Sequence, residues 1–328
     1  MDIVFGFFLV SILLFVRPQK DKVDYMSVGN ILPLRGIMAV LIILHHFSEK
    51  IVGGRFFPLL QHAGYLIVAI FFFLSGYGLM FSYNIRGKEY LKDFLKNRVL
   101  YLVIVYLLVT ALYAVYHIII GDFRFSLTIA ENSWYIWIQI ILYIFFWFSF
   151  KFFGGKSKKT AICSIFVLQV LLTILLIFAG FADIWYISNF AFIFGIFISF
   201  NKTKIDFIIK KYYLVFAFSS FVLFAVFSIL PTVIGFYTIF RMLSTVSFCL
   251  VFMSIIYVIR ITSKFWSSIG KFSLEIYLLH GFVYMFLHRF ISNDVLWIIV
   301  TLVITIPLSY SASLINTKIK KLLKTYRQ

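Results

Sequence analysis

The chain has 328 residues, of which 63% are hydrophobic and only 13% charged, and its formal net charge is +18. Soluble domains average about 45–50% apolar and about 25% charged residues, so this composition excludes a soluble globular protein and a disordered chain. The apolar runs are continuous, whereas a membrane β-barrel shows short segments of alternating polarity. The composition therefore predicts an all-α fold, a polytopic transmembrane helical bundle.

Eleven apolar segments follow one another along the chain. Most of them reach the ~20 residues that a helix needs to cross a ~30 Å hydrocarbon core. The first is shorter, and a half-inserted or interfacial helix is the alternative for it. A cleaved signal peptide is disfavoured, because no basic region and no small-residue cleavage site precede Arg17. The segments are residues 3–16, 32–47, 59–83, 99–120, 134–153, 161–181, 184–200, 213–230, 234–259, 272–291 and 295–315.

The basic residues are distributed unevenly between the loops. Of the 30 Lys and Arg residues, 24 lie in the loops after the first, third, fifth, seventh and ninth segments or in the C-terminal tail. Cytoplasmic loops are enriched in Lys and Arg, so this pattern predicts a multi-pass cell-membrane protein with its N-terminus outside and its C-terminus in the cytoplasm. The positive charge is thereby assigned to topology in the lipid bilayer, and no nucleic-acid partner is expected.

Ionisable residues within apolar segments are costly and are therefore functional candidates. Arg35 opens the second segment, Arg241 lies in the ninth and Glu275 in the tenth. Arg35 and His46 are about three helical turns apart and ~20° apart around the helix, whereas His45 is displaced from Arg35 by ~80°. One helix face therefore carries a cation near the predicted cytoplasmic mouth, ~5 Å into the membrane, and an imidazole ~21 Å into the membrane, as a polar tunnel would require.

Ser75 in the third segment and His280 in the tenth both lie ~12 Å from the predicted cytoplasmic ends. A lone membrane serine most often packs helices or bonds its own backbone, and the nearby Gly76 and Gly78 are typical of close helix packing. The sequence contains no HExxH, nucleophile-elbow, Walker or GxGxxG motif, so it predicts no metal site and no nucleotide fold.

Several short motifs occur in order along the chain. Residues 34–39 read LRGIMA and are followed by LHH at 44–46, and residues 71–77 read FFFLSGY. Residues 134–136 read WYI, and residues 270–280 read GKFSLEIYLLH. These resemble the R-x10-H first helix, the FFxLSG second helix, the W-F/Y-L signature and the late G-x-x-S-x-x-I/L-Y-L-x-H helix of the integral-membrane acyltransferase-3 family.

The resemblance implies a ten-helix membrane acyltransferase domain over residues 32–328, with residues 1–31 forming an extra N-terminal helix and a cytoplasmic loop. It implies an O-acetyltransferase that moves an acyl group, most often acetyl, from cytosolic acyl-CoA to a hydroxyl of a cell-envelope glycan or lipid-linked sugar. Acetyl-CoA is then a co-substrate, and no cofactor is expected to be tightly bound.

The resemblance also implies roles for individual residues. His46 is expected to act as the general base, and Arg35 to hold the donor at the mouth of the tunnel. The loop after the Ser75 helix would hold the CoA phosphates through Arg86, Lys88 and Arg98, although these charges could serve topology alone. The residues expected to line the substrate site are Ser75, His280, Glu275, Trp134 and Arg241.

Two positions depart from the family pattern and bear on the acceptor. Gln139 stands where many members carry a glutamate, and Tyr101 replaces the second arginine of a frequent R-x-x-R segment. A transporter or flippase for lipid-linked sugars is the alternative function, and it would move its substrate without consuming acyl-CoA. A structural scaffold gives no reason to bury Arg35 and Glu275. The Phe-rich, Lys-rich and Cys-poor composition is compatible with a bacterium of low GC content.

Overall fold

The structure is a computed structural model that describes residues 1–20, 25–51, 53–121 and 134–325, with side chains described up to residue 318. Lys22, Arg124 and Arg327, which contribute to the charge pattern, lie outside the described residues. The chain divides into two compact units. Unit 1 comprises Met1–Gly64, Val103–Ser133 and Val258–Gln328, and unit 2 comprises Tyr65–Leu102 and Trp134–Tyr257.

The described chain is almost entirely helical, and the prediction of an all-α polytopic bundle is confirmed. Nine of its helices are long and apolar enough to cross a membrane, and each corresponds to one predicted segment. The other two predicted segments form shorter helices, α1 (Asp2–Leu13) with 12 residues and α14 (Ser273–His288) with 16. A 16-residue helix is only ~24 Å long, which is less than a ~30 Å hydrocarbon core.

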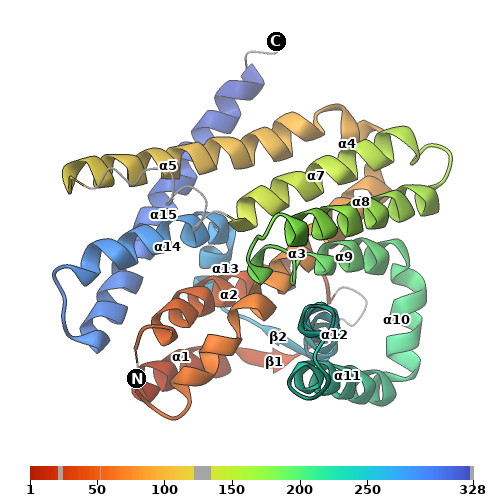
Figure 1. Cartoon of the computed structure of the whole chain (residues 1–328). Helices are drawn as coiled ribbons and strands as arrows, with labels where there is room; N and C mark the ends of the chain where they lie inside the picture. Colours follow the sequence, from red (N-terminus) through yellow and green to blue (C-terminus); the bar gives the residue numbers. More distant parts are fainter. Residues whose placement is uncertain (21–24, 52, 122–133, 326–328) are drawn as a thin grey trace. The chain divides into compact units, whose positions relative to one another are not determined.

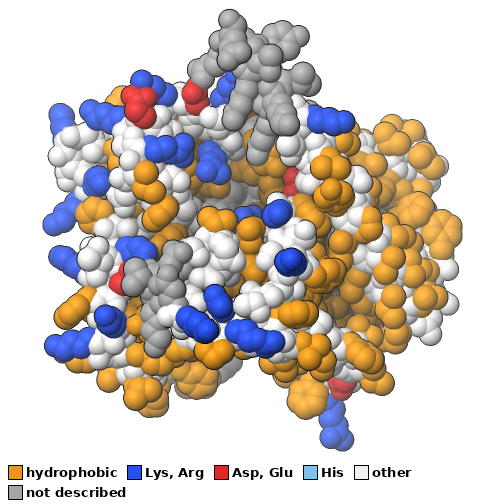
Figure 2. All heavy atoms as spheres, turned by 180° about the vertical axis from the view of Figure 1, so that it is seen from behind, with side chains coloured by type: hydrophobic (Ala, Val, Ile, Leu, Met, Phe, Trp, Pro, Cys, Tyr) orange, Lys and Arg blue, Asp and Glu red, His pale blue; other side chains and the backbone are white. Residues whose placement is uncertain are grey.

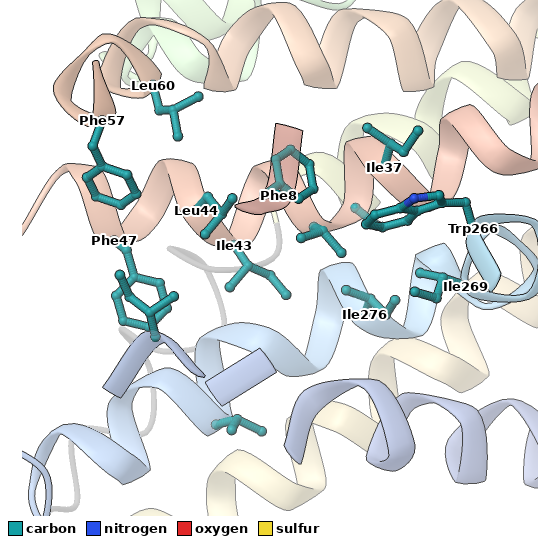
Figure 3. Packing of buried hydrophobic residues seen from close by; sticks show 14 of the residues in the cluster. Phe8, Ile37, Ile43, Leu44, Phe47, Phe57, Leu60, Trp266, Ile269 and Ile276 are labelled. Carbon is teal, nitrogen blue, oxygen red and sulfur yellow. The ribbon is translucent and has the colours of Figure 1, made fainter. Parts of the chain in front are cut away.

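Unit 1 is built around one long helix, α2 (Figure 1). Its apolar side chains pack with Phe8, Phe57 and Trp266, which come from three other elements of the unit (Figure 3). Placing this helix at the centre of the unit buries apolar area on several of its sides. The elements of unit 1, besides α1 and α14, are β1 (Val16–Pro18), α2 (Val28–Ser48), η1 (Phe57–His62), most of α5 (Tyr101–Ile119), β2 (Ile259–Ile261), α13 (Lys264–Lys271) and α15 (Asp294–Thr325).

The N-terminal segment is fixed to unit 1 by polar contacts at both of its ends. The Asp2 carboxylate accepts hydrogen bonds from the backbone N–H groups of Arg55, Phe56 and Phe57 at 2.7–3.0 Å. After α1, strand β1 pairs antiparallel with β2, so that Arg17 lies opposite Arg260. These contacts hold α1 against a loop and a strand that are distant in sequence.

Two glycines allow α2 and α13 to approach closely. A Cβ atom on Gly36 would lie 2.3 Å from the Trp266 carbonyl oxygen, and one on Gly270 would lie 1.9 Å from the Leu32 carbonyl oxygen. Any side chain at either position would collide with backbone atoms of the other helix. The glycines of two family-like motifs therefore have a packing role.

Unit 2 contains an equivalent close crossing. A Cβ on Gly76 of α3 would lie 2.0 Å from the Phe192 carbonyl oxygen of α9, and one on Gly195 would lie 2.1 Å from the Phe73 carbonyl oxygen. The elements of unit 2 are α3 (Gly64–Arg86), α4 (Glu89–Lys92), η2 (Leu95–Leu100), α7 (Trp134–Phe152), α8 (Lys158–Phe178), η3 (Asp183–Trp185), α9 (Phe190–Phe200), α10 (Lys202–Lys211), α11 (Tyr213–Ile234) and α12 (Tyr237–Val258).

Many large hydrophobic side chains are exposed, as the orange surface of Figure 2 shows. Helix α11 is the most exposed of the long apolar helices, since only 6% of the residues in its most apolar stretch are buried. Apolar exposure on this scale is unfavourable in water and typical of helices that contact lipid.

Candidate active site

Helix α2 presents two of the predicted site residues to α14. The Arg35 Nη2 atom donates a hydrogen bond of 3.0 Å to Ser273 Oγ at the start of α14. Three turns later, the His46 ring stacks on the ring of His280, with centroids 5.1 Å apart and an interplanar angle of 19°. Arg35 and His46 therefore face the same partner helix, as their spacing in the sequence predicts.

A carboxylate orients the imidazole of His46. His46 Nδ1 lies 3.0 Å from Glu49 Oε2, and it must be the donor because an ionised carboxylate only accepts. The hydrogen bond from His46 is the largest cause that holds the pKa of Glu49 below its usual value, so Glu49 is ionised at neutral pH. In a neutral ring the lone pair is then on Nε2. The side chains of His46 and Glu49 are 43% and 46% exposed, so this histidine–carboxylate pair is accessible.

His45 has different partners from its neighbour. Its Nδ1 lies 2.9 Å from the Leu60 carbonyl oxygen and donates to it, while its Nε2 lies 3.6 Å from Glu49 Oε1. The side chain is only 12% exposed. Gly64 packs against the ring, because a Cβ there would lie 2.2–2.6 Å from three ring atoms. His45 is thus held between η1, Gly64 and Glu49.

Two further polar residues of α14 are buried in unit 1. Glu275 Oε1 accepts a 3.0 Å hydrogen bond from Asn316 Nδ2 of α15. His280 Nδ1 lies 3.1 Å from the Ile276 carbonyl oxygen and donates to it, which leaves Nε2 of a neutral ring as an acceptor. Unit 1 therefore combines a cation, two stacked imidazoles and two carboxylates along α2 and α14.

The other predicted site residues belong to unit 2. Arg241 of α12 lies over two aromatic rings, 4.5 Å from the centroid of Tyr65 and 4.6 Å from that of Tyr237. Trp134 begins α7 and meets the ring of Tyr135 edge to face, and Ser75 lies half-buried in α3. The structure thus places Ser75, Trp134 and Arg241 in one unit and Arg35, His46, Glu275 and His280 in the other.

The proposed phosphate-binding residues are exposed in unit 2. The Arg86 guanidinium lies 4.3 Å from the Tyr90 ring centroid. The Lys88 ammonium covers Gly155, where a Cβ would lie 2.7 Å from Nζ. Arg98 lies in η2. Near the same end of α3, Lys158 Nζ donates a 2.9 Å hydrogen bond to Asn84 Oδ1.

Sequence reasoning missed Glu49, Ser273, Asn316 and Lys158. Glu49 could have been found, because residues three apart on a helix are neighbours and a His–Glu pair at that spacing interacts. Ser273 stands within a family-like motif, but its contact with Arg35 joins residues 238 positions apart. Asn316 lies on another helix from Glu275, and nothing in its sequence neighbourhood marks it.

Comparison with known proteins identifies the family. Searches of curated proteins and of solved structures each returned no significant match. The sequence model of the acyltransferase-3 family, described as an acyltransferase domain, matches residues 33–314. This range covers most of the chain and includes every site residue predicted from the sequence. Because the match is this extensive, the chain belongs to the acyltransferase-3 family of membrane acyltransferases.

Proposed function

We propose that this protein is a membrane-embedded O-acyltransferase that moves an acyl group, most often acetyl, from acyl-CoA to a hydroxyl of a cell-envelope glycan or lipid-linked sugar. The observation that carries the proposal is the 3.0 Å contact from His46 Nδ1 to Glu49 Oε2, on a chain of the acyltransferase family. A carboxylate at Nδ1 fixes the tautomer and leaves Nε2 to accept a proton.

The reaction follows from that tautomer. Nε2 of His46 takes the proton of the acceptor hydroxyl as its oxygen attacks the thioester carbonyl carbon. The new C–O bond forms, the C–S bond breaks, and the imidazolium returns the proton to the CoA thiolate. The Glu49 carboxylate stabilises the imidazolium while it carries the positive charge. The products are the acyl ester and free CoA.

Arg35 supplies a positive charge at the other end of α2. His46 lies eleven positions after Arg35, which corresponds to ~16 Å of helix. We assign the Arg35 end to the cytoplasm on the basis of the Lys and Arg distribution, which also places the N-terminus outside and the C-terminus inside. Acyl-CoA would then enter past Arg35, and the acceptor hydroxyl would approach His46 and Glu49 from the outer end.

The exposed cations of unit 2 suit the phosphates of CoA. Arg86 ends α3, Lys88 follows two residues later, and Arg98 lies in η2. Exposed guanidinium and ammonium groups bind phosphate oxygens in charge-assisted hydrogen bonds. In the proposed orientation these residues are cytoplasmic, on the side where acyl-CoA is available.

The decisive experiment compares the two adjacent histidines. Membranes containing each variant at matched abundance are supplied with acetyl-labelled acetyl-CoA, and both label transfer to membrane glycans and CoA release are measured. We expect His46→Ala to remove most of the ~10²–10⁴-fold that a general base contributes. His45→Ala should remain active within a few-fold, because its ring is bonded to the Leu60 carbonyl oxygen, whereas it is the His46 ring that stacks on His280 of α14.

The same experiment separates the competing function. A transporter or flippase releases no CoA, so a wild-type protein without CoA release contradicts the proposal. An inactive His45→Ala beside an active His46→Ala would show that the base has been assigned to the wrong ring. Glu49→Gln should fall between wild type and His46→Ala, since the amide can accept a hydrogen bond but carries no charge.

A further inference from the structure

We infer that His45, His46 and Glu49 form a binding site for a transition-metal ion of the zinc type at the end of α2, and that an ion bound there blocks acyl transfer. Each residue offers one ligand atom, and the three atoms lie within 4.8 Å of one another. Two imidazoles and one carboxylate form a ligand set that zinc uses, with a fourth position left for water. The inhibitory part of the inference rests on the proposed function, whereas the site itself does not.

The spacing of the ligand atoms is close to that of a formed site. Zinc–ligand bonds of about 2.0–2.2 Å in a tetrahedron place neighbouring ligand atoms about 3.3–3.5 Å apart. His45 Nε2 lies 3.6 Å from Glu49 Oε1, and His46 Nδ1 lies 3.0 Å from Glu49 Oε2. The three ligand atoms lie within 4.8 Å of one another, so side-chain movements of up to about 1.5 Å would bring them to the spacing that the ion requires.

His45 is oriented as metal-binding histidines usually are. Such a ring donates its second N–H to a carbonyl or carboxylate, which fixes the ring and exposes the other nitrogen. Nδ1 of His45 makes this bond to the Leu60 carbonyl oxygen, so its Nε2 lone pair is directed toward Glu49. A Cβ on Gly64 would lie 2.2 Å from Nε2 and 2.5–2.6 Å from both ring carbons bonded to it, so Gly64 packs over the ring face at Nε2 and not in line with the in-plane lone pair.

A metal ion and the proposed base compete for His46. An ion bound to Nδ1 replaces the proton that Glu49 holds there, and the proton of the neutral ring then resides on Nε2. Nε2 becomes a donor and cannot accept the proton of the acceptor hydroxyl. The ion also occupies the carboxylate that would stabilise the imidazolium. The 43% and 46% exposure of His46 and Glu49 gives an ion access to the site.

Direct binding is measured first, because it does not depend on enzymatic activity. The purified full-length protein is titrated with Zn²⁺ against a chromogenic chelator, and with Co²⁺ while the visible absorption of tetrahedral cobalt is recorded. We expect one site in the wild type. His45→Gln and Glu49→Gln should each weaken it at least about tenfold, since even outer-sphere partners contribute that much. His288→Gln is the matched control, because this histidine lies at the end of α14 with its ring on Trp297.

Inhibition is then measured as the Zn²⁺ concentration that halves each variant's own rate of acetyl-CoA-dependent transfer. It should rise at least about tenfold in His45→Gln and stay unchanged in His288→Gln. Equal binding in wild type, His45→Gln and Glu49→Gln would overturn the site. A wild type that transfers acetyl normally with the site filled, or that loses activity when chelators remove metal, would overturn the inhibitory role. If no acyl transfer occurs at all, the titration still decides whether the site exists.

Discussion

Gly76→Ala should destabilise the protein, whereas Gly78→Ala, two residues further along α3, should not. A Cβ on Gly76 would lie 2.0 Å from the Phe192 carbonyl oxygen, while one on Gly78 has nothing within 4 Å. Carbon–oxygen contacts are normally about 3.3–3.6 Å, so α3 and α9 would have to separate by about 1.3 Å. Overpacking costs about 1–3 kcal/mol or more, and we expect the upper end because a backbone carbonyl cannot rotate aside.

Replacing Gly78 carries no such collision and reduces the flexibility of a helix interior, which should stabilise it by about 0.5–1 kcal/mol. Thermal unfolding of the two purified variants in detergent checks the difference. We expect Gly76→Ala to melt at least about 5 °C below Gly78→Ala. Equal melting temperatures, or a lower value for Gly78→Ala, would refute the inference that Gly76 is required by the close crossing with α9.

Three further predictions follow from the contacts of other residues. Neutralising Arg86, Lys88 and Arg98 together should raise the KM for acetyl-CoA more than it lowers kcat. The effect should be largest at low salt, because these charges are exposed and salt screens them. Asn316→Leu should lower stability by about 1–3 kcal/mol in denaturation, because Glu275 loses a buried donor. Hydrogen bonds from the Arg55 and Phe57 backbones lower the pKa of Asp2, so its carboxylate stays ionised and keeps these bonds down to about pH 3.8. Hydrogen exchange of the Arg55–Phe57 amides should therefore accelerate only below that pH in the wild type, but at every pH in Asp2→Ala.

Most of the fold could be predicted from the sequence, because a membrane helix is marked by a continuous apolar run. The short elements could not be predicted in this way. The segment predicted at 59–83 divides into η1 and α3. The sequence did not reveal this division, because Leu59 and Leu60 are as apolar as the helix that follows. Helix α13 has polar residues at both ends and no long apolar run, so only its close packing on α2 reveals its position.

The site was predictable within one helix but not between helices. The 3.6-residue period is sufficient to place Arg35 and His46 on a common face, and it separates His45 from them. The partners that fix these side chains come from elsewhere in the chain, as Ser273 does for Arg35. Such contacts depend on how helices cross, and the crossing of α2 and α13 depends on Gly36 and Gly270.

The position of His46 also constrains how the two substrates meet. The ring lies in the last turn of α2 and is 43% exposed, whereas Arg35 lies near the other end of the helix and contacts the first residue of α14. A base buried midway along α2 would require both substrates to enter the membrane interior. In the proposed mechanism, a base at the helix end requires only the acyl group to enter the membrane interior, carried on the flexible arm of CoA for ~16 Å past Arg35. The proposed acceptor, a large envelope glycan, would then need to bring only its hydroxyl to the end of α2.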